Sequence, residues 1–353
     1  MAIYLDHAAT TPLRREVLDA MLPYLTESFG NPSSAHGYGR AARAALDEAH
    51  ERLARALGAE ARELVFTSGG TEANNLAIKG GAWAGKAHGH RIVTSTIEHH
   101  AVGHTLRYLE KFGFEVVEVP VDRYGRVDPD QVEAALTDRT ILVSIMLANN
   151  EVGTIQPITA IADHVRSRKG VLFHVDAVQA APYVDLDVRT LGADMVSLGA
   201  HKFEGPKGAG ALWIRHGTHL LAQQHGGTQE RHRRAGTENV AGAVGLATAY
   251  ELTCAERPAT VARLRAQAAR LREALLSVDG VEATGHPVER LPGLVSIIGR
   301  GTDGTSVALS LDLEGIAASV GSACTTGSRR RNAATWRSGV IRQISMLPPS
   351  SQT

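Results

Sequence analysis

Short runs of β-branched and aliphatic residues alternate along most of the chain with longer segments of helical periodicity. The runs occupy residues 63–67, 91–95, 115–119, 140–148, 171–175, 194–198 and 210–214. Because short apolar strands separated by helices build a sheet that is covered on both faces, this alternation predicts an α/β fold with a mostly parallel sheet.

The helical pattern is clear in the segment 38–57. Leu46, Ala49, Leu53 and Leu57 fall on one stripe of a helix, and Gly58 follows directly, where a helix-ending residue is expected. We therefore expect a helix that packs this stripe against the core.

A change of pattern after residue 238 indicates a domain boundary. The segment 238–276 is rich in Ala, Leu and Arg, which predicts long helices that leave the sheet domain and break near Pro258. A strand-like run at 294–298 follows. The pattern predicts a large domain over residues 13–257 and a smaller α+β domain that contains 258–353.

Lys202 and Asp176 are the residues that say most about the chemistry of this protein. Lys202 stands where a predicted strand gives way to a glycine-rich turn, and Asp176 ends a neighbouring strand. A lysine so placed can form a Schiff base with pyridoxal phosphate, while the aspartate keeps the pyridine nitrogen protonated. The rival interpretation is a surface lysine after a core strand and an unrelated strand-ending aspartate, and the joint context favours the cofactor site.

The segment 68–71 (SGGT) follows a strand and opens a helix. Its backbone N–H groups and the Thr71 hydroxyl can meet a phosphate at the positive end of that helix. The alternative is that this turn is only a tight connection between the strand and the helix.

Eight motifs, in order along residues 1 to 328, resemble the class V, fold-type I pyridoxal phosphate enzymes, specifically cysteine desulfurases of the NifS/IscS type. They are YLDHAATTP (4–12), GNPSSAH (30–36), SGGTEANN (68–75), EH (98–99), NNEVG (149–153), GGTQER (226–231), GTEN (236–239) and GSAC (321–324). The resemblance implies that residues 1–12 complete the small domain.

The resemblance also implies roles for individual residues. The cofactor phosphate would be held by Gly70, Thr71 and His201, together with Thr237 from the other subunit of a homodimer. Gln179 would hydrogen-bond the phenolic oxygen, and Asn150 would support the ring and the substrate.

The phosphate cradle departs from the family at one position. Gly199 stands where the family usually has a phosphate-binding serine, and losing one hydroxyl should weaken cofactor binding by about 1 kcal/mol.

His99 matches the histidine that stacks on the cofactor ring and helps to move protons. An alternative takes His99, His100 and His104 as metal ligands, because His100 and His104 are four residues apart on a predicted helix. No HExxH pattern and no further carboxylate or cysteine ligand at suitable spacing supports this alternative, so we expect no metal.

Cys324 lies among small polar residues, which favours an exposed loop. By resemblance, its thiolate takes sulfur from cofactor-bound L-cysteine as a persulfide and passes it to an acceptor. Cys254, in an Ala- and Leu-rich helical context, is expected to be a buried apolar residue.

The composition excludes several classes of partner. Lys and Arg number 37 and Asp and Glu also number 37, so no net field draws the chain to nucleic acid or a membrane surface. The two cysteines provide no disulfide framework, which fits a reducing compartment. With no leader-like segment and no run of about 18 apolar residues, we expect a cytoplasmic protein.

After Ser328 the sequence departs from the family pattern. The segment 339–342 resembles the family's carboxylate-binding arginine segment, but Arg342 follows Cys324 by only 18 residues (342 minus 324). We expect a frameshift, an internal deletion or a truncation of the reading frame, with possible loss of activity.

The sequence therefore predicts a cytoplasmic, homodimeric enzyme that converts L-cysteine to L-alanine and supplies sulfur to an acceptor, such as an iron-sulfur scaffold or the tRNA thiolation machinery. Two alternatives stay open. One is another class V enzyme, a selenocysteine lyase or an aminotransferase, and the other is a catalytically impaired scaffold for sulfur-carrier proteins.

Overall fold

The computed structural model of the chain describes residues 3–321 and 344–345. Cys324 and Arg342, predicted to act on the substrate, lie outside these described residues.

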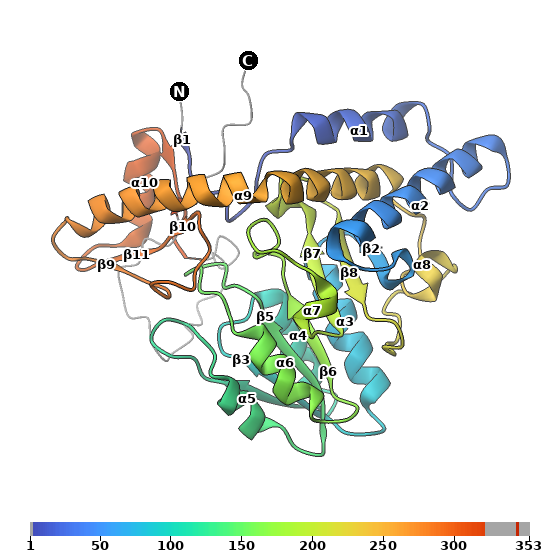
Figure 1. Cartoon of the computed structure of the whole chain (residues 1–353), viewed down its shortest axis with the longest axis horizontal. Helices are drawn as coiled ribbons and strands as arrows, with labels where there is room; N and C mark the ends of the chain where they lie inside the picture. Colours follow the sequence, from blue (N-terminus) through green and yellow to red (C-terminus); the bar gives the residue numbers. More distant parts are fainter. Residues whose placement is uncertain (1–2, 322–343, 346–353) are drawn as a thin grey trace.

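A seven-stranded sheet forms the centre of the molecule (Figure 1). Its strands, in spatial order, are β2 (Leu64–Thr67), β8 (Gly210–Ile214), β7 (Met195–Gly199), β6 (Leu172–Asp176), β5 (Thr140–Met146), β3 (Arg91–Ser95) and β4 (Glu115–Val119). Only β8 pairs antiparallel with its two neighbours, and the other pairs are parallel. The predicted mostly parallel sheet is confirmed, with strand ends that differ by one or two residues.

Helices cover both faces of this sheet, and two large clusters of buried apolar residues lie beneath them. On one face lie α3 (Gly70–Gly85) and α4 (His100–Glu110). On the other lie α5 (Pro129–Ala135), α6 (Ile158–Arg166) and α7 (Val188–Leu191). Because helices shield both faces from water, the central strands can be apolar on both sides, as β5 is.

The predicted helix 38–57 is present as α2 (Gly37–Leu57). Its stripe of Leu46, Ala49, Leu53 and Leu57 is buried, and Gly58 closes it in the left-handed conformation with φ 69°. The helix packs on α9 (Val240–Leu276), which also contacts α1 (Arg15–Thr26) (Figure 1).

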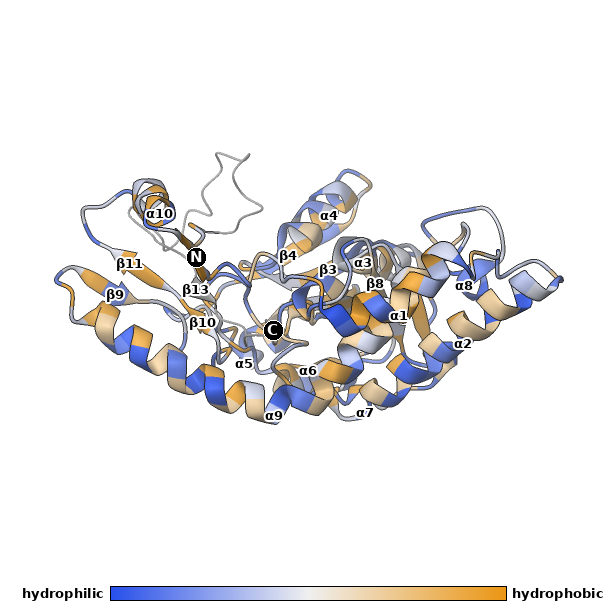
Figure 2. Ribbon diagram, turned by 90° about the horizontal axis from the view of Figure 1, so that it is seen from above, coloured by the Kyte–Doolittle hydropathy of each residue, from blue (hydrophilic) through white to orange (hydrophobic). Residues whose placement is uncertain are grey.

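The break expected near Pro258 is absent, because α9 continues through that proline. A proline inside a helix costs about 3 kcal/mol, and packing on both sides of it offsets this cost. The buried Arg257 donates to Asp185 and the first half of α9 packs on α1 and α2, while Leu264 in the second half is also fully buried. Figure 2 shows α9 along one side of the molecule, from α1 and α2 to the strands β9 (Val281–Ala283) and β11 (Ile297–Gly299).

Short strand pairs and one helix form the smaller part of the structure. They are β9 (Val281–Ala283) with β11 (Ile297–Gly299), β10 (Leu294–Val295) with β13 (Ile344–Ser345), β1 (Ile3–Tyr4) with β12 (Ile316–Ala317), and α10 (Gly304–Leu313). The run 294–298 is thus divided between β10 and β11. The parallel pairing of β1 with β12 brings the N-terminal segment to this part, as the resemblance implied, while the exact domain limits stay a prediction.

In the part of the chain that the structure describes, every helix is too short or too polar to cross a membrane.

Candidate active site

A cavity of about 470 Å³ opens at the carboxyl ends of the central strands. Ligands of α/β sheets commonly bind at this edge, and the volume lies in the usual range for small-molecule sites. Most of the residues predicted from the sequence line it, namely Gly70, Thr71, His99, Asn150, Asp176, Gln179, His201 and Lys202. The cavity therefore gathers side chains that lie far apart in the sequence.

Lys202 ends the short 3-10 turn η2 (Ala200–Lys202), directly after β7. Its amine donates hydrogen bonds to the carbonyl oxygens of Ala8 and, at 3.0 Å, Ala9. Thr11 strengthens the same junction, because its hydroxyl donates to the carbonyl oxygen of His201 at 2.9 Å. The N-terminal segment thus forms one wall of the cavity and orients the lysine amine.

Asp176 is the last residue of β6, and only 5% of its surface is exposed. Its carboxylate accepts hydrogen bonds from the Asn74 amide at 2.6 Å and from the backbone N–H of Val178 at 3.0 Å. Both donors stabilise negative charge, so the carboxylate is oriented before any ligand arrives.

A buried polar chain crosses the sheet beneath Asp176. The two ring nitrogens of His174 lie 2.9 Å from the hydroxyls of Ser144 on β5 and Ser197 on β7. Burial lowers the pKa of His174 to about 3, so the ring is neutral at neutral pH. This chain fixes β6 relative to both of its neighbours, at two residues from Asp176.

His99 caps the N-terminus of α4. Its Nδ1 accepts the backbone N–H of Ala101 at 3.1 Å, so the neutral ring carries its proton on Nε2. Burial lowers the pKa of His99, the charge on Asp176 raises it, and the charge on Lys202 lowers it. His99 therefore presents a neutral, proton-donating ring to the cavity.

The start of α3 and the N-terminal segment form the candidate phosphate cradle. Gly69 has a φ of 151°, and a Cβ at Gly70 would meet the Val178 side chain at 2.5 Å, so this turn depends on glycine. His201 Nδ1 lies 3.1 Å from the Thr10 hydroxyl. Burial, followed by the charge of Lys202, lowers the pKa of His201 to about 4 and keeps the ring uncharged.

Gly199 lies against this cradle. A Cβ there would meet Val178 at 3.2 Å and the backbone nitrogen of Gly70 at 3.5 Å. A side chain at this position would thus point toward the start of α3, where the family usually places its serine hydroxyl.

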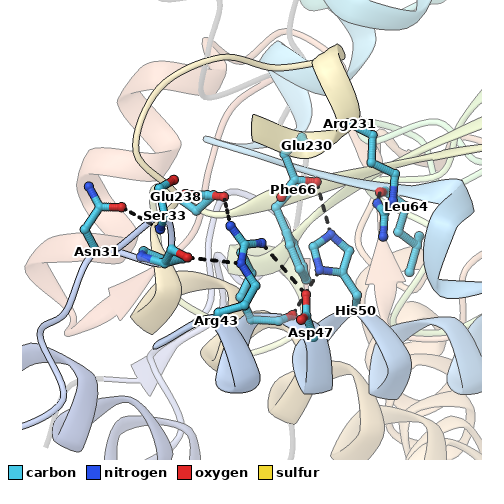
Figure 3. A network of polar contacts seen from close by, with 12 residues as sticks. Asn31, Ser33, Arg43, Asp47, His50, Leu64, Phe66, Glu230, Arg231 and Glu238 are labelled. Carbon is cyan, nitrogen blue, oxygen red and sulfur yellow. Dashed lines mark hydrogen bonds and ion pairs between the residues drawn. The ribbon is translucent and has the colours of Figure 1, made fainter. Parts of the chain in front are cut away.

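Thr237 does not line the cavity of its own chain and is exposed. Figure 3 shows how the segment around it is anchored. Glu230 accepts from the Phe66 backbone N–H at 3.1 Å and lies 3.0 Å from the His50 ring, while Arg43 donates to Glu238 at 2.9 Å.

These contacts hold strained backbone in the short helix α8 (Gln229–His232). Glu230, Arg231 and His232 have φ of 45°, 56° and 64°, which costs a non-glycine residue about 1–3 kcal/mol. The buried Glu230 carboxylate holds this segment on β2 and α2, so Thr237 is presented from a fixed loop.

Cys254, on α9, is half-buried rather than fully buried as expected. It packs against the apolar core, and Arg257 lies 3.1 Å from its sulfur. Burial raises the pKa of this thiol, which makes it a poor nucleophile.

The histidines of the metal alternative do not form a ligand cluster in the described structure. The His100 and His104 rings stack at 4.8 Å with an interplanar angle of 13°. Over residues 3–321, metal-type ligands gather at Asp130, Glu133 and His164, and none of these three lines the cavity.

Sequence reasoning missed several residues that shape the cavity. Asn74 lies within the quoted 68–75 motif, yet nothing in the motif pairs it with Asp176. The carbonyls of Ala8 and Ala9 reach Lys202 through backbone geometry, which no side-chain pattern reveals. Glu98 belongs to the 98–99 motif, which by itself indicates no role for it.

These residues fit pyridoxal phosphate. A lysine amine, an acidic group and a glycine-built helix start face one cavity, as a flat aldehyde with a phosphate requires. The Gln179 side-chain oxygen is buried and finds no hydrogen-bond partner among the described residues. Such an atom is costly unless a ligand or water meets it, which indicates a polar ligand at this wall.

Comparison with known proteins agrees with this geometry. The family model for class V aminotransferases matches residues 3–350. The chain is 50% identical over 327 residues to cysteine desulfurase IscS of Methanosarcina thermophila, covering 93% of this chain and 81% of that protein. It is 49% identical to IscS of Dictyoglomus turgidum, covering 92% and 83%.

Solved structures give the same result. A NifS-like protein superposes with a TM-score of 0.91 at 36% identity, covering all of this chain and 95% of the other. SspA, solved in complex with cysteine, superposes with a TM-score of 0.84 at 32% identity, covering 98% of this chain and 100% of the other. The chain therefore belongs to the class V aminotransferase family and, within it, to the IscS- and NifS-type cysteine desulfurases.

Proposed function

We propose that this protein is a pyridoxal phosphate-dependent cysteine desulfurase that converts L-cysteine to L-alanine. The observation that carries the proposal is the placement of Lys202, Asp176 and His99 around one cavity. The 50% sequence identity of the chain to an IscS protein supports it. When bound, the cofactor would act as an electron sink that eases loss of the substrate Cα proton.

The residues of the cavity would have separate roles. Lys202 would hold the cofactor through its amine and move the Cα proton of the substrate. Asp176 would keep the pyridine nitrogen protonated, and His99 would stack on the ring with its Nε2 proton available to donate. Gly70, Thr71 and His201 would bind the phosphate.

The resemblance that assigns the roles of His99 and of the phosphate-binding residues also assigns the remaining ligands. Gln179 would hydrogen-bond the phenolic oxygen of the cofactor. Asn150 and Arg342 would bind the substrate.

Cys324 would accept the sulfur. Its thiolate attacks the sulfur of the bound L-cysteine, the carbon–sulfur bond breaks, and the electron pair of that bond stays with the carbon, which is protonated to give alanine. The sulfur remains on Cys324 as a persulfide for an acceptor protein, such as an iron-sulfur scaffold or a component of tRNA thiolation.

We further propose a cytoplasmic homodimer in which Thr237 reaches the phosphate of the partner subunit. The exposed, anchored loop that carries Thr237 supports this arrangement. Large apolar side chains exposed on and beside α1 also favour a protein interface. They are Leu18, Leu22, Leu25, Phe29 and Tyr38.

The test is to incubate the purified protein with L-cysteine and a thiol reductant and to measure alanine and sulfide. Equal amounts of both are expected. A parallel assay with a keto acid and an amino donor detects an aminotransferase, and selenocysteine replaces cysteine to detect a lyase preference. Bound cofactor without any alanine would contradict the proposal and would favour a sulfur-carrier scaffold.

Replacing Asp176 with asparagine should lower kcat/KM for L-cysteine by about 10- to 100-fold, because a hydrogen bond to a charged group contributes about 1.5–3 kcal/mol. Asparagine keeps the size of the side chain but supplies no negative charge to the ring nitrogen. Steady-state kinetics measures the effect, and the visible spectrum of the bound cofactor should change in parallel. A variant with wild-type kcat/KM would remove this role from Asp176.

A further inference from the structure

Glu98 lies directly behind the cavity, between the end of β3 and the start of α4. Its Oε1 accepts hydrogen bonds from the Ser95 hydroxyl at 2.5 Å and from the Met146 backbone N–H at 3.1 Å. Ser95 ends β3 and Met146 ends β5. One carboxyl group thus joins the ends of two neighbouring strands, next to His99.

The second oxygen of Glu98 has a different environment. Oε2 is shielded from solvent and has no hydrogen-bond partner in the described part of the chain. A buried carboxylate oxygen without a partner is costly, whereas a neutral carboxylic acid is much less so. Burial raises the pKa of Glu98 to about 8, although the hydrogen bonds from Ser95 and Met146 lower it, and the nearby charge of Asp176 adds a smaller rise.

A charged group that acts on Glu98 is Asp176, on β6. Asp176, Lys202, His100 and Glu151 act in turn on His99, the neighbour of Glu98 in the chain. An ionised Glu98 would add a second negative charge beside Asp176, which like-charge repulsion disfavours.

We propose that Glu98 is a positioning residue of this active site, which in its uncharged form fixes the ends of β3 and β5 behind His99 and adds no second negative charge beside Asp176. The proposal rests on the proposed function, since it concerns the same cavity. The first two of its tests do not depend on turnover.

The first test follows unfolding against pH in the cofactor-loaded protein. A carboxyl whose pKa is raised in the folded state binds more protons there than when unfolded, so it destabilises the fold as pH rises toward about 8. Glu98→Gln cannot titrate. As the pH rises toward this pKa, the folding equilibrium constant of the wild type should therefore fall relative to that of Glu98→Gln. The fall should be up to about tenfold for each pH unit.

A matched control is Glu110→Gln, which changes an exposed glutamate at the end of α4, the helix that begins just after Glu98. Its pH dependence should follow the wild type. Parallel curves for the wild type and Glu98→Gln between about pH 6 and 8 would overturn the proposal.

The second test is infrared spectroscopy of the same proteins at neutral pH. The carbonyl band of a buried protonated carboxylic acid is expected in the wild type and in Glu110→Gln and should be lost in Glu98→Gln. Absence of this band in the wild type would overturn the proposal even if the variants fail to fold.

Kinetics separates positioning from a merely structural role. The alkaline limb of the kcat/KM profile should move to higher pH in Glu98→Gln, and Glu98→Ala should lower kcat more than Glu98→Gln does. An unchanged alkaline limb would contradict the proposal. A protein that shows the infrared band but no desulfurase activity would refute the proposed function and leave the neutral Glu98 in place.

Discussion

Replacing Lys202 with alanine is expected to lower turnover of L-cysteine by about 10⁴-fold or more. A positioned general base alone contributes about 10² to 10⁴ in rate, and this lysine would also hold the cofactor. The structure supports both tasks, because two backbone carbonyls orient the amine at the cavity wall. The loss should appear in kcat, since the other residues of the cavity remain.

The covalent attachment of the cofactor to Lys202 can be measured without turnover. Borohydride reduction of the wild type followed by peptide mapping should place the reduced cofactor on the peptide that contains Lys202, and Lys202→Ala should show none. The matched control is Lys207→Ala, which removes another lysine that lines the cavity. Attachment that persists in Lys202→Ala or disappears in Lys207→Ala would refute the assignment.

The sequence predicted those features of the fold that depend on neighbours along the chain. The strands of the central sheet and the buried stripe of α2 follow from periodicity alone, because a strand or helix with one apolar face must bury it. The continuous α9 did not follow. Propensity placed a break at Pro258, and packing of α9 against α1 and α2 outweighs it.

The candidate site was also predicted only in part. Motifs indicated Lys202 and Asp176 because a cofactor of known chemistry needs such groups. The partners that orient them come from remote segments, with Asn74 102 residues from Asp176 and Ala8 194 residues from Lys202. Only the folded chain brings these residues together, and no local pattern encodes the pairing.

The two cysteines of the chain allow a clean test of sulfur transfer. Cys254 is unsuited to act as the nucleophile, because it is half-buried on α9, does not line the cavity and has a raised pKa. A thiol of raised pKa is a small fraction thiolate at neutral pH. The assignment of the nucleophile to Cys324 therefore rests on the 321–324 motif together with the exclusion of Cys254.

Replacing Cys324 with alanine should lower alanine formation by on the order of 10³-fold or more, the scale expected when an enzyme loses its nucleophile. The matched Cys254→Ala variant should keep its activity. Mass spectrometry after a single turnover adds a second readout, because a gain of one sulfur atom should appear in the wild type and in Cys254→Ala but not in Cys324→Ala. Since each variant retains a single cysteine, persulfide found on Cys254, or full alanine formation by Cys324→Ala, would assign sulfur release to a different group.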